Sequence, residues 1–158
     1  QCIATYAAEM QARATYADVV GEVVDELRDR VDAAYAAGVA PDRLAVDPGL
    51  GFAKTADHNW ELLRHLDALE DLALPVLVGA SRKSFLGTLL AEPDGTPRPV
   101  DEREEAGVAV NTLAAAAGAW CLRVHDVRRT VDALKVVARW EGREFVASGP
   151  AGRVVGDE

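Results

Sequence analysis

The stretch PVLVGASRKSFLG, residues 75–87, decides the fold of this chain. It begins with an unbroken apolar run, which is typical of a β-strand buried on both faces of a parallel sheet. Ser81 follows almost at once, in a position to cap the helix predicted over residues 81–90. A buried strand that leads directly into a helix is the repeating unit of parallel α/β folds, in which helices cover the sheet.

The same alternation continues on both sides of this stretch. Amphipathic spacing and short apolar runs predict the other elements, which are helices over residues 16–37, 57–69, 101–119 and 126–140 and strands over residues 43–47 and 120–124. Strands joined by helices run parallel, because such connections cross over with a single hand. The sequence therefore predicts about three parallel strands with flanking helices, either as an open sheet or as part of a barrel.

Composition limits the classes of function. The 158 residues include 17 Lys and Arg against 26 Asp and Glu, which gives a net charge of −9. This charge argues against a nucleic-acid partner, because neutralising phosphates needs a basic surface. No apolar run approaches the roughly 18 residues of a membrane span. The two cysteines, Cys2 and Cys121, match no metal-ligand spacing and favour a reducing, cytoplasmic setting.

The two ends of the chain carry less pattern. The chain starts at Gln1, without Met and without the basic region of a signal peptide, so we expect a fragment of a longer protein. Residues 142–158 show no periodicity, and we expect them to form a flexible tail after a domain over residues 1–141.

Unusual polar residues follow all three predicted strands. They form three groups: Asp47 with the glycine-rich loop to Lys54, then Ser81 with Arg82 and Lys83, and finally Arg123 with His125. In parallel α/β folds the functional groups collect where the strands end. We therefore expect the three groups to share one face of the sheet.

Arg123 gives the strongest indication of a ligand. It lies two residues before His125, so both side chains point to the same side of the strand. An arginine in an otherwise apolar strand is costly unless it is paired, and its planar fork suits phosphate. The alternative is an ion pair between Arg123 and either Asp126 or Asp47.

The other two groups also have two interpretations. Asp47 either accepts paired N–H bonds from a heterocycle or stabilises the Pro-Gly turn that follows it. Arg82 and Lys83, at a helix start, either bind an anion or extend into water. Lys54 is expected to be solvated, and no spacing of residues predicts a metal site in this chain.

Three motifs together resemble the closing segments of bacterial dihydropteroate synthases, with the actinobacterial enzymes most similar. These motifs are DPGLGFAKTADHNWELL (residues 47–63), PVLVGASRKSFLG and RVHDV (residues 123–127). The resemblance covers residues 18–140 and implies the C-terminal part of a (β/α)8 TIM barrel, so that residues 1–141 form a partial pterin-binding domain. It implies an enzyme of folate biosynthesis, a sulfonamide target that joins p-aminobenzoate to 6-hydroxymethyl-7,8-dihydropterin pyrophosphate and releases pyrophosphate.

The resemblance implies roles for residues of all three groups. Asp47 would hydrogen-bond the pterin ring, and Lys83 would contact the carbonyl side of that ring. Arg123 would hold the leaving pyrophosphate together with His125. The p-aminobenzoate pocket would be lined by residues of the first two groups, which are Gly51, Phe52, Ser81 and Arg82, with Ser81 near the carboxylate. Asp47, Lys83 and Arg123 are the expected catalytic residues.

The resemblance also implies what this chain lacks. The complete enzyme would use Mg²⁺ through a ligand in the first half of the barrel, and it would act on small-molecule substrates as a homodimer. We therefore expect the chain alone to be incomplete for catalysis. Two alternatives remain, namely a truncated paralogue that serves as a non-catalytic assembly module, and a pterin-dependent methyltransferase on the same barrel.

Overall fold

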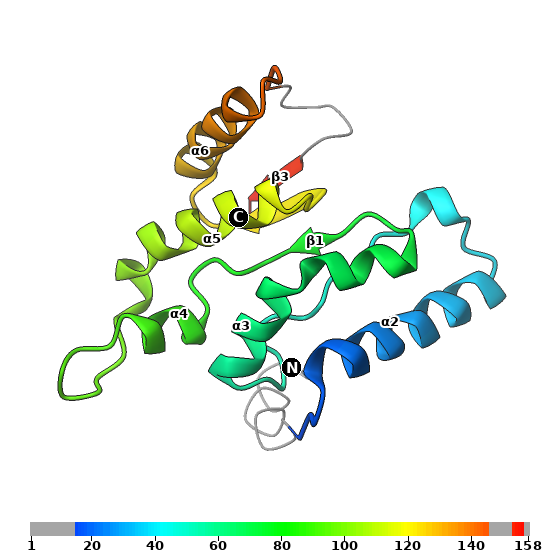
Figure 1. Cartoon of the computed structure of the whole chain (residues 1–158), viewed down its shortest axis with the longest axis horizontal. Helices are drawn as coiled ribbons and strands as arrows, with labels where there is room; N and C mark the ends of the chain where they lie inside the picture. The colour runs from blue at the N-terminus through cyan, green and yellow to red at the C-terminus, as the bar shows by residue number, and fades with distance from the viewer. Residues whose placement is uncertain (1–14, 146–152, 157–158) are drawn as a thin grey trace.

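The structure is a computed structural model, and it describes residues 15–145 and 153–156 (Figure 1). Its α-helices are α2 (Val19–Ala36), α3 (Ala56–Arg64), α4 (Ser84–Leu89), α5 (Glu104–Ala116) and α6 (Val127–Trp140). Short 3₁₀ helices are η1 (Pro41–Arg43), η2 (Leu66–Leu72) and η3 (Val100–Glu102). The strands are β1 (Leu77–Val78), β2 (Cys121–Val124) and β3 (Arg153–Gly156). The expected α/β alternation is confirmed.

The strands form a parallel sheet in the order β1-β2-β3. The first predicted strand, residues 43–47, is reduced to one parallel bridge between Val46 and Val76. Two backbone hydrogen bonds hold this bridge, from the Val46 N–H to the Pro75 carbonyl at 2.9 Å and from the Leu77 N–H to the Val46 carbonyl at 2.8 Å. The segment ends there because Pro48 has no N–H to continue the ladder.

β3 is an element that the sequence analysis does not predict. It lies within residues 142–158, which were expected to form a flexible tail, and it pairs with β2 from Cys121↔Arg153 to Val124↔Gly156. A partial barrel leaves strand edges unpaired, and an unpaired edge accepts any short extended segment. Residues 146–152 and 157–158 of this tail, and the N-terminal residues 1–14 with Cys2, lie outside the described residues.

The core lies between the sheet and the helices that pack on it. α2 packs against α3 and η2, α3 against α4, and α5 against α6 (Figure 1). Trp60 and Phe85 meet edge to face, with ring centroids 5.1 Å apart. The most deeply buried apolar side chains come from helices, strands and a loop: Leu50, Leu69, Val78, Phe85, Leu86 and Val124. Within the described residues, no helix combines the length and the apolarity needed to cross a bilayer.

Most helix boundaries differ from the prediction by a few residues, and two of these differences have a clear local cause. The helix predicted from residue 57 begins one residue earlier, because Thr55 accepts a hydrogen bond from the His58 N–H and caps α3. The helix predicted from residue 81 begins only at residue 84. Ser81 does not cap it, since the preceding residues form a tight turn in which the Lys83 N–H bonds to the Ala80 carbonyl at 3.2 Å.

Candidate functional site

The loop after Val46 is shaped by the first predicted site residue. Asp47 Oδ1 accepts a hydrogen bond from the Gly49 N–H at 2.8 Å, and the Phe52 N–H bonds to the Gly49 carbonyl at 3.1 Å. Asp47 therefore does stabilise the turn, as its less specific interpretation predicts. This contact also fixes the half-buried carboxylate at the end of the extended segment.

Lys54 is buried, and the expectation that it is solvated is wrong. The residue is 7% exposed, and Nζ donates to the carbonyl oxygens of Gly49 and Phe52, each at 3.2 Å. Burial lowers the pKa of Lys54, while the nearby carboxylates of Glu26 and Asp47 raise it in part. Lys54 thus links the Gly49 and Phe52 carbonyls of the glycine-rich loop.

Asn59, on α3, also holds this loop, and the sequence analysis did not identify it. It is 2% exposed, its Oδ1 accepts from the Gly51 N–H at 2.6 Å, and its Nδ2 donates to the Thr55 carbonyl at 2.7 Å. A buried amide with both ends satisfied fixes the backbone around it. The sequence carries one sign of this role: Asn59 is a polar residue next to Trp60 on the apolar side of the predicted helix.

Lys83 brings the first and second groups together. Its Nζ donates to the Leu50 carbonyl oxygen, and the ammonium lies 4.7 Å from the centroid of the Phe52 ring. A Cβ at Gly51 would stand 2.9 Å from Lys83 Cδ, and Gly51 also has φ +76°. Only glycine satisfies both the backbone angle and the close approach of the lysine.

The charge of Lys83 is set by its surroundings. Burial lowers the pKa of Lys83 to about 8, against an ordinary value of 10.5. Asp47 opposes this change, whereas Arg123 and Lys54 lower the pKa further. Lys83 therefore interacts with charged residues from both of the other groups, which places it at the junction of all three strand ends.

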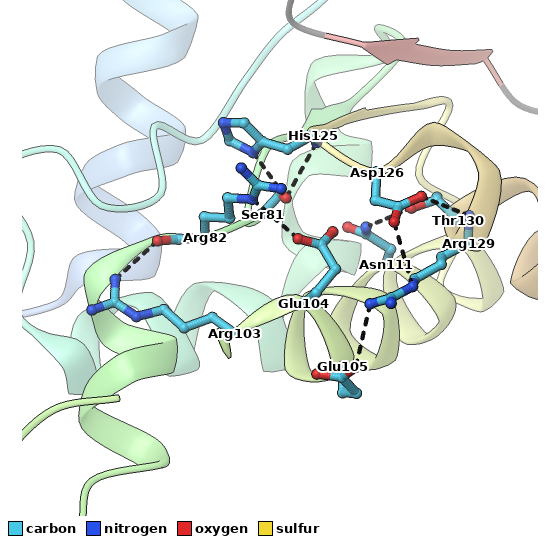
Figure 2. Close-up of polar contacts among 10 residues, drawn as sticks. All are labelled: Ser81, Arg82, Arg103, Glu104, Glu105, Asn111, His125, Asp126, Arg129 and Thr130. Atoms are coloured by element: carbon cyan, nitrogen blue, oxygen red, sulfur yellow. Dashed lines mark hydrogen bonds and ion pairs between the residues drawn. The ribbon is translucent and has the colours of Figure 1, made fainter. Parts of the chain in front are cut away.

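Ser81 and His125 join the second group to the third (Figure 2). Ser81 Oγ lies 3.0 Å from His125 Nδ1 and accepts a hydrogen bond from the His125 backbone N–H at 3.3 Å. Ser81 is 6% exposed, while the His125 side chain is exposed. The serine hydroxyl thus holds the Nδ1 edge of the imidazole, and the residue stays exposed.

Arg123 lies over the neighbouring strand end. A Cβ at Gly79 would stand 3.2 Å from Arg123 Nε and 3.3 Å from its Nη2, so the missing side chain makes room for the guanidinium. The alternative ion pair is not formed: within residues 15–145, no carboxylate lies within 4.0 Å of Arg123. Asp126 instead caps α6 through the Arg129 N–H at 2.9 Å and pairs with the Arg129 side chain at 3.4 Å.

Arg82 differs from the other predicted site residues. Its guanidinium turns toward α5, where Nε lies 3.1 Å from Glu104 Oε2 (Figure 2). Its backbone has φ +59°, which costs a residue other than glycine about 1–2 kcal/mol. Phe52 is 46% exposed beside Lys83, so it offers an aromatic face at the rim of the site.

The arrangement supplies fixed charges of both signs. Cations come from Lys83 and Arg123, and the carboxylate of Asp47 lies near enough to Lys83 to raise its pKa. Groups that are fixed before a reaction stabilise charge that develops during it without reorganising. Among the described residues, no group of three His, Cys, Asp or Glu side chains fits a metal ion.

Known proteins similar to this chain agree with one another. The family model described as "Pterin binding enzyme" matches residues 2–125. The dihydropteroate synthase of Mycobacterium leprae is 58% identical over 125 residues, which is 79% of this chain and 44% of that protein. The dihydropteroate synthase of Escherichia coli is 40% identical over 128 residues, or 81% of this chain and 43% of that protein.

Solved structures give the same result for the fold. A Yersinia pestis dihydropteroate synthase with a sulfonamide drug superposes with a TM-score of 0.77 at 38% identity, over 84% of this chain and 46% of that one. A Xanthomonas albilineans dihydropteroate synthase with 4-aminobenzoic acid gives a TM-score of 0.73 at 45% identity, over 80% and 44% of the two chains. The expected fold, part of a TIM barrel, is confirmed.

These matches show the family of the chain and how much of its relatives the chain covers. The chain spans less than half the length of the curated relatives it matches, as the shares of 44% and 43% show. The predicted resemblance is confirmed, and the names of the relatives favour a synthase over a methyltransferase. This chain belongs to the family of pterin binding enzymes, and the relatives it resembles are dihydropteroate synthases.

Proposed function

We propose that the complete gene product containing this chain is a dihydropteroate synthase of folate biosynthesis. It would condense p-aminobenzoate with 6-hydroxymethyl-7,8-dihydropterin pyrophosphate and release pyrophosphate. The observation that carries this proposal is the position of Lys83, which bonds to the Leu50 carbonyl and is influenced by both Asp47 and Arg123. One lysine thus links three motifs that are far apart in the sequence.

The reaction separates charge, and different site residues would stabilise the negative charge and the positive charge. The bond between the pterin methylene carbon and the pyrophosphate oxygen breaks, and its electron pair leaves on the oxygen. The arylamine nitrogen then bonds to the methylene carbon and loses a proton. Arg123 and His125 would hold the pyrophosphate as negative charge builds, and Asp47 would stabilise the cationic pterin.

The p-aminobenzoate pocket would lie between the first two groups. Ser81 would face the carboxylate, and the exposed ring of Phe52 would cover one side of the arylamine. Gly51 admits the Lys83 side chain to this corner, since any Cβ there would meet it. Arg82 would contribute its backbone more than its guanidinium, because Glu104 holds the latter.

Mg²⁺ and a second subunit belong to the proposal for the complete protein. The described residues do not fit a metal centre, so no step is routed through the ion, and its ligands would lie elsewhere in the gene product. A homodimer would form through α5 and α6, where apolar side chains are exposed: Leu113 at 70%, Val136 at 64% and Trp140 at 90%. The proposed setting of the complete protein is the cytoplasm.

The test is pyrophosphate release by the complete gene product. We expect release that requires both p-aminobenzoate and the pterin pyrophosphate, and that a sulfonamide inhibits in competition with p-aminobenzoate. For the 158-residue chain alone we expect weak or no binding of the pterin pyrophosphate in calorimetry. Release that is independent of p-aminobenzoate would contradict the proposed reaction.

A further inference from the structure

The start of α5 holds the turn that carries Arg82 (Figure 2). Arg103, at the N-cap position of α5, donates from Nη1 to the Arg82 carbonyl oxygen at 3.0 Å and from Nε to the Arg98 carbonyl oxygen at 2.7 Å. Its guanidinium also lies against α4, where a Cβ at Gly87 would stand 2.5 Å from Nε. Arg103 is therefore fixed between α4, the loop before α5 and the turn.

The next residue of α5 holds the same turn through its side chain. Glu104 has a side chain only 8% exposed, and its Oε2 lies 3.1 Å from Arg82 Nε. Gly107 brings α5 close to the turn as well, since a Cβ there would be in ordinary van der Waals contact with Ser81 Cα at 3.8 Å. Consecutive residues of one helix thus hold both the backbone and the side chain of Arg82.

What they hold is a backbone conformation that Arg82 does not favour. Its φ of +59° lies in the left-handed region, which residues with a Cβ avoid. Such a conformation persists only where the surroundings fix it. Ser81 precedes Arg82 directly, so the position of the Ser81 hydroxyl against His125 depends on this turn.

We propose that Arg103 and Glu104 are positioning residues for the p-aminobenzoate side of the site. They act through the turn, and the inference rests on the proposed function for the identity of that substrate. Lys83 has a separate anchor at the Leu50 carbonyl, so the pterin side is less dependent on α5. Loss of the Arg103 contact therefore displaces Ser81 first.

The test uses two variants of the complete gene product. Arg103→Gln removes the guanidinium, and Gly87→Ala keeps it but displaces it with a new Cβ. Each variant is expected to raise KM for p-aminobenzoate by about tenfold, the equivalent of one lost charge-assisted hydrogen bond. KM for the pterin pyrophosphate and kcat are expected to stay near the wild-type values. If Arg103→Gln does not fold, Gly87→Ala carries the test.

The matched control is Arg129→Gln. Arg129 pairs with Glu105, the residue next to Glu104 on α5, and with Asp126, but it does not contact the turn (Figure 2). We expect both KM values to be unchanged in this variant. Equal rises of both KM values in Arg103→Gln and Gly87→Ala would overturn the inference, since they indicate a general loosening of the protein.

Hydrogen exchange separates this inference from the proposed function. The Lys83 amide, bonded to the Ala80 carbonyl, is expected to exchange about tenfold faster in both variants and at the wild-type rate in Arg129→Gln. Unchanged exchange in both variants overturns the inference whatever the activity. A wild-type protein that forms no dihydropteroate, with faster exchange in the variants, refutes the proposed function and leaves the turn-holding role supported.

Discussion

Lys83 makes the stability of the protein depend on pH in a way that can be measured directly. Its pKa is about 8 in the folded protein and 10.5 as the ordinary value, so between these pH values the unfolded chain binds more protons than the folded one. The free energy of unfolding therefore rises as pH increases from about 8 to 10.5. The substitution Lys83→Met removes the group that gains and loses the proton, and it keeps most of the side-chain volume.

The size of the effect follows from the pKa difference. At about 1.4 kcal/mol for each pKa unit, the full difference corresponds to about 3 kcal/mol. The ammonium is only partly buried, and solvent screening reduces the effect by about half. We therefore expect the unfolding free energy of the wild type minus that of Lys83→Met to rise by about 1–2 kcal/mol across this window.

Urea unfolding at a series of pH values measures this difference. Subtracting the unfolding free energy of the variant from that of the wild type removes the contributions of the other groups that titrate at high pH. Lys135→Met is the control, because Lys135 is an exposed side chain that pairs with Asp132 on α6, and its stability curve is expected to run parallel to that of the wild type. A Lys83→Met curve that also runs parallel would contradict this prediction, since it means that burial does not lower the pKa of Lys83.

Three further predictions concern the rest of the site in the complete gene product. Asp47→Ala and Arg123→Ala are each expected to lower kcat for dihydropteroate formation by about a hundredfold or more, because each removes one fixed charge; steady-state kinetics with near-normal rates would show the assignment to be wrong. Gly51→Ala is expected to lower the melting temperature and weaken pterin binding in calorimetry, since Cβ would meet Lys83 at 2.9 Å with φ at +76°. Asn59→Leu is expected to cost about 1–3 kcal/mol of unfolding free energy, because the Gly51 N–H loses its acceptor; denaturant unfolding with no change would contradict this role.

The strand ends were predictable because buried parallel strands have a strong signal. The apolar run before Ser81 identifies β1, and every group that follows a predicted strand does lie at the end of an extended segment. Arg123 makes no ion pair with Asp126 or Asp47 in the described part of the chain, so the ion-pair alternative is wrong, while the anion site stays a prediction. The space for Arg123 depends on Gly79, and the sequence showed that glycine only as part of a strand.

Contacts between distant residues were not predictable. Nothing near Lys54 in the sequence indicates that its ammonium lies under the glycine-rich loop, since burial of a lysine depends on carbonyl groups that only the folded loop presents. The same is true of the pair between Arg82 and Glu104, which are 22 residues apart. β3 was not predicted because a short strand at a sheet edge needs no hydrophobic periodicity of its own.

We propose that these strand ends form the site of a dihydropteroate synthase and that Lys83 lies where they meet. The most direct test is mass-spectrometric detection of dihydropteroate formed by the complete gene product from both substrates, with wild type and Lys83→Ala compared at equal concentration. We predict product from the wild type, with the p-aminobenzoate nitrogen joined to the pterin methylene, and about a hundredfold less from Lys83→Ala. No product from a folded wild-type protein, or equal rates from the two proteins, would contradict the claim.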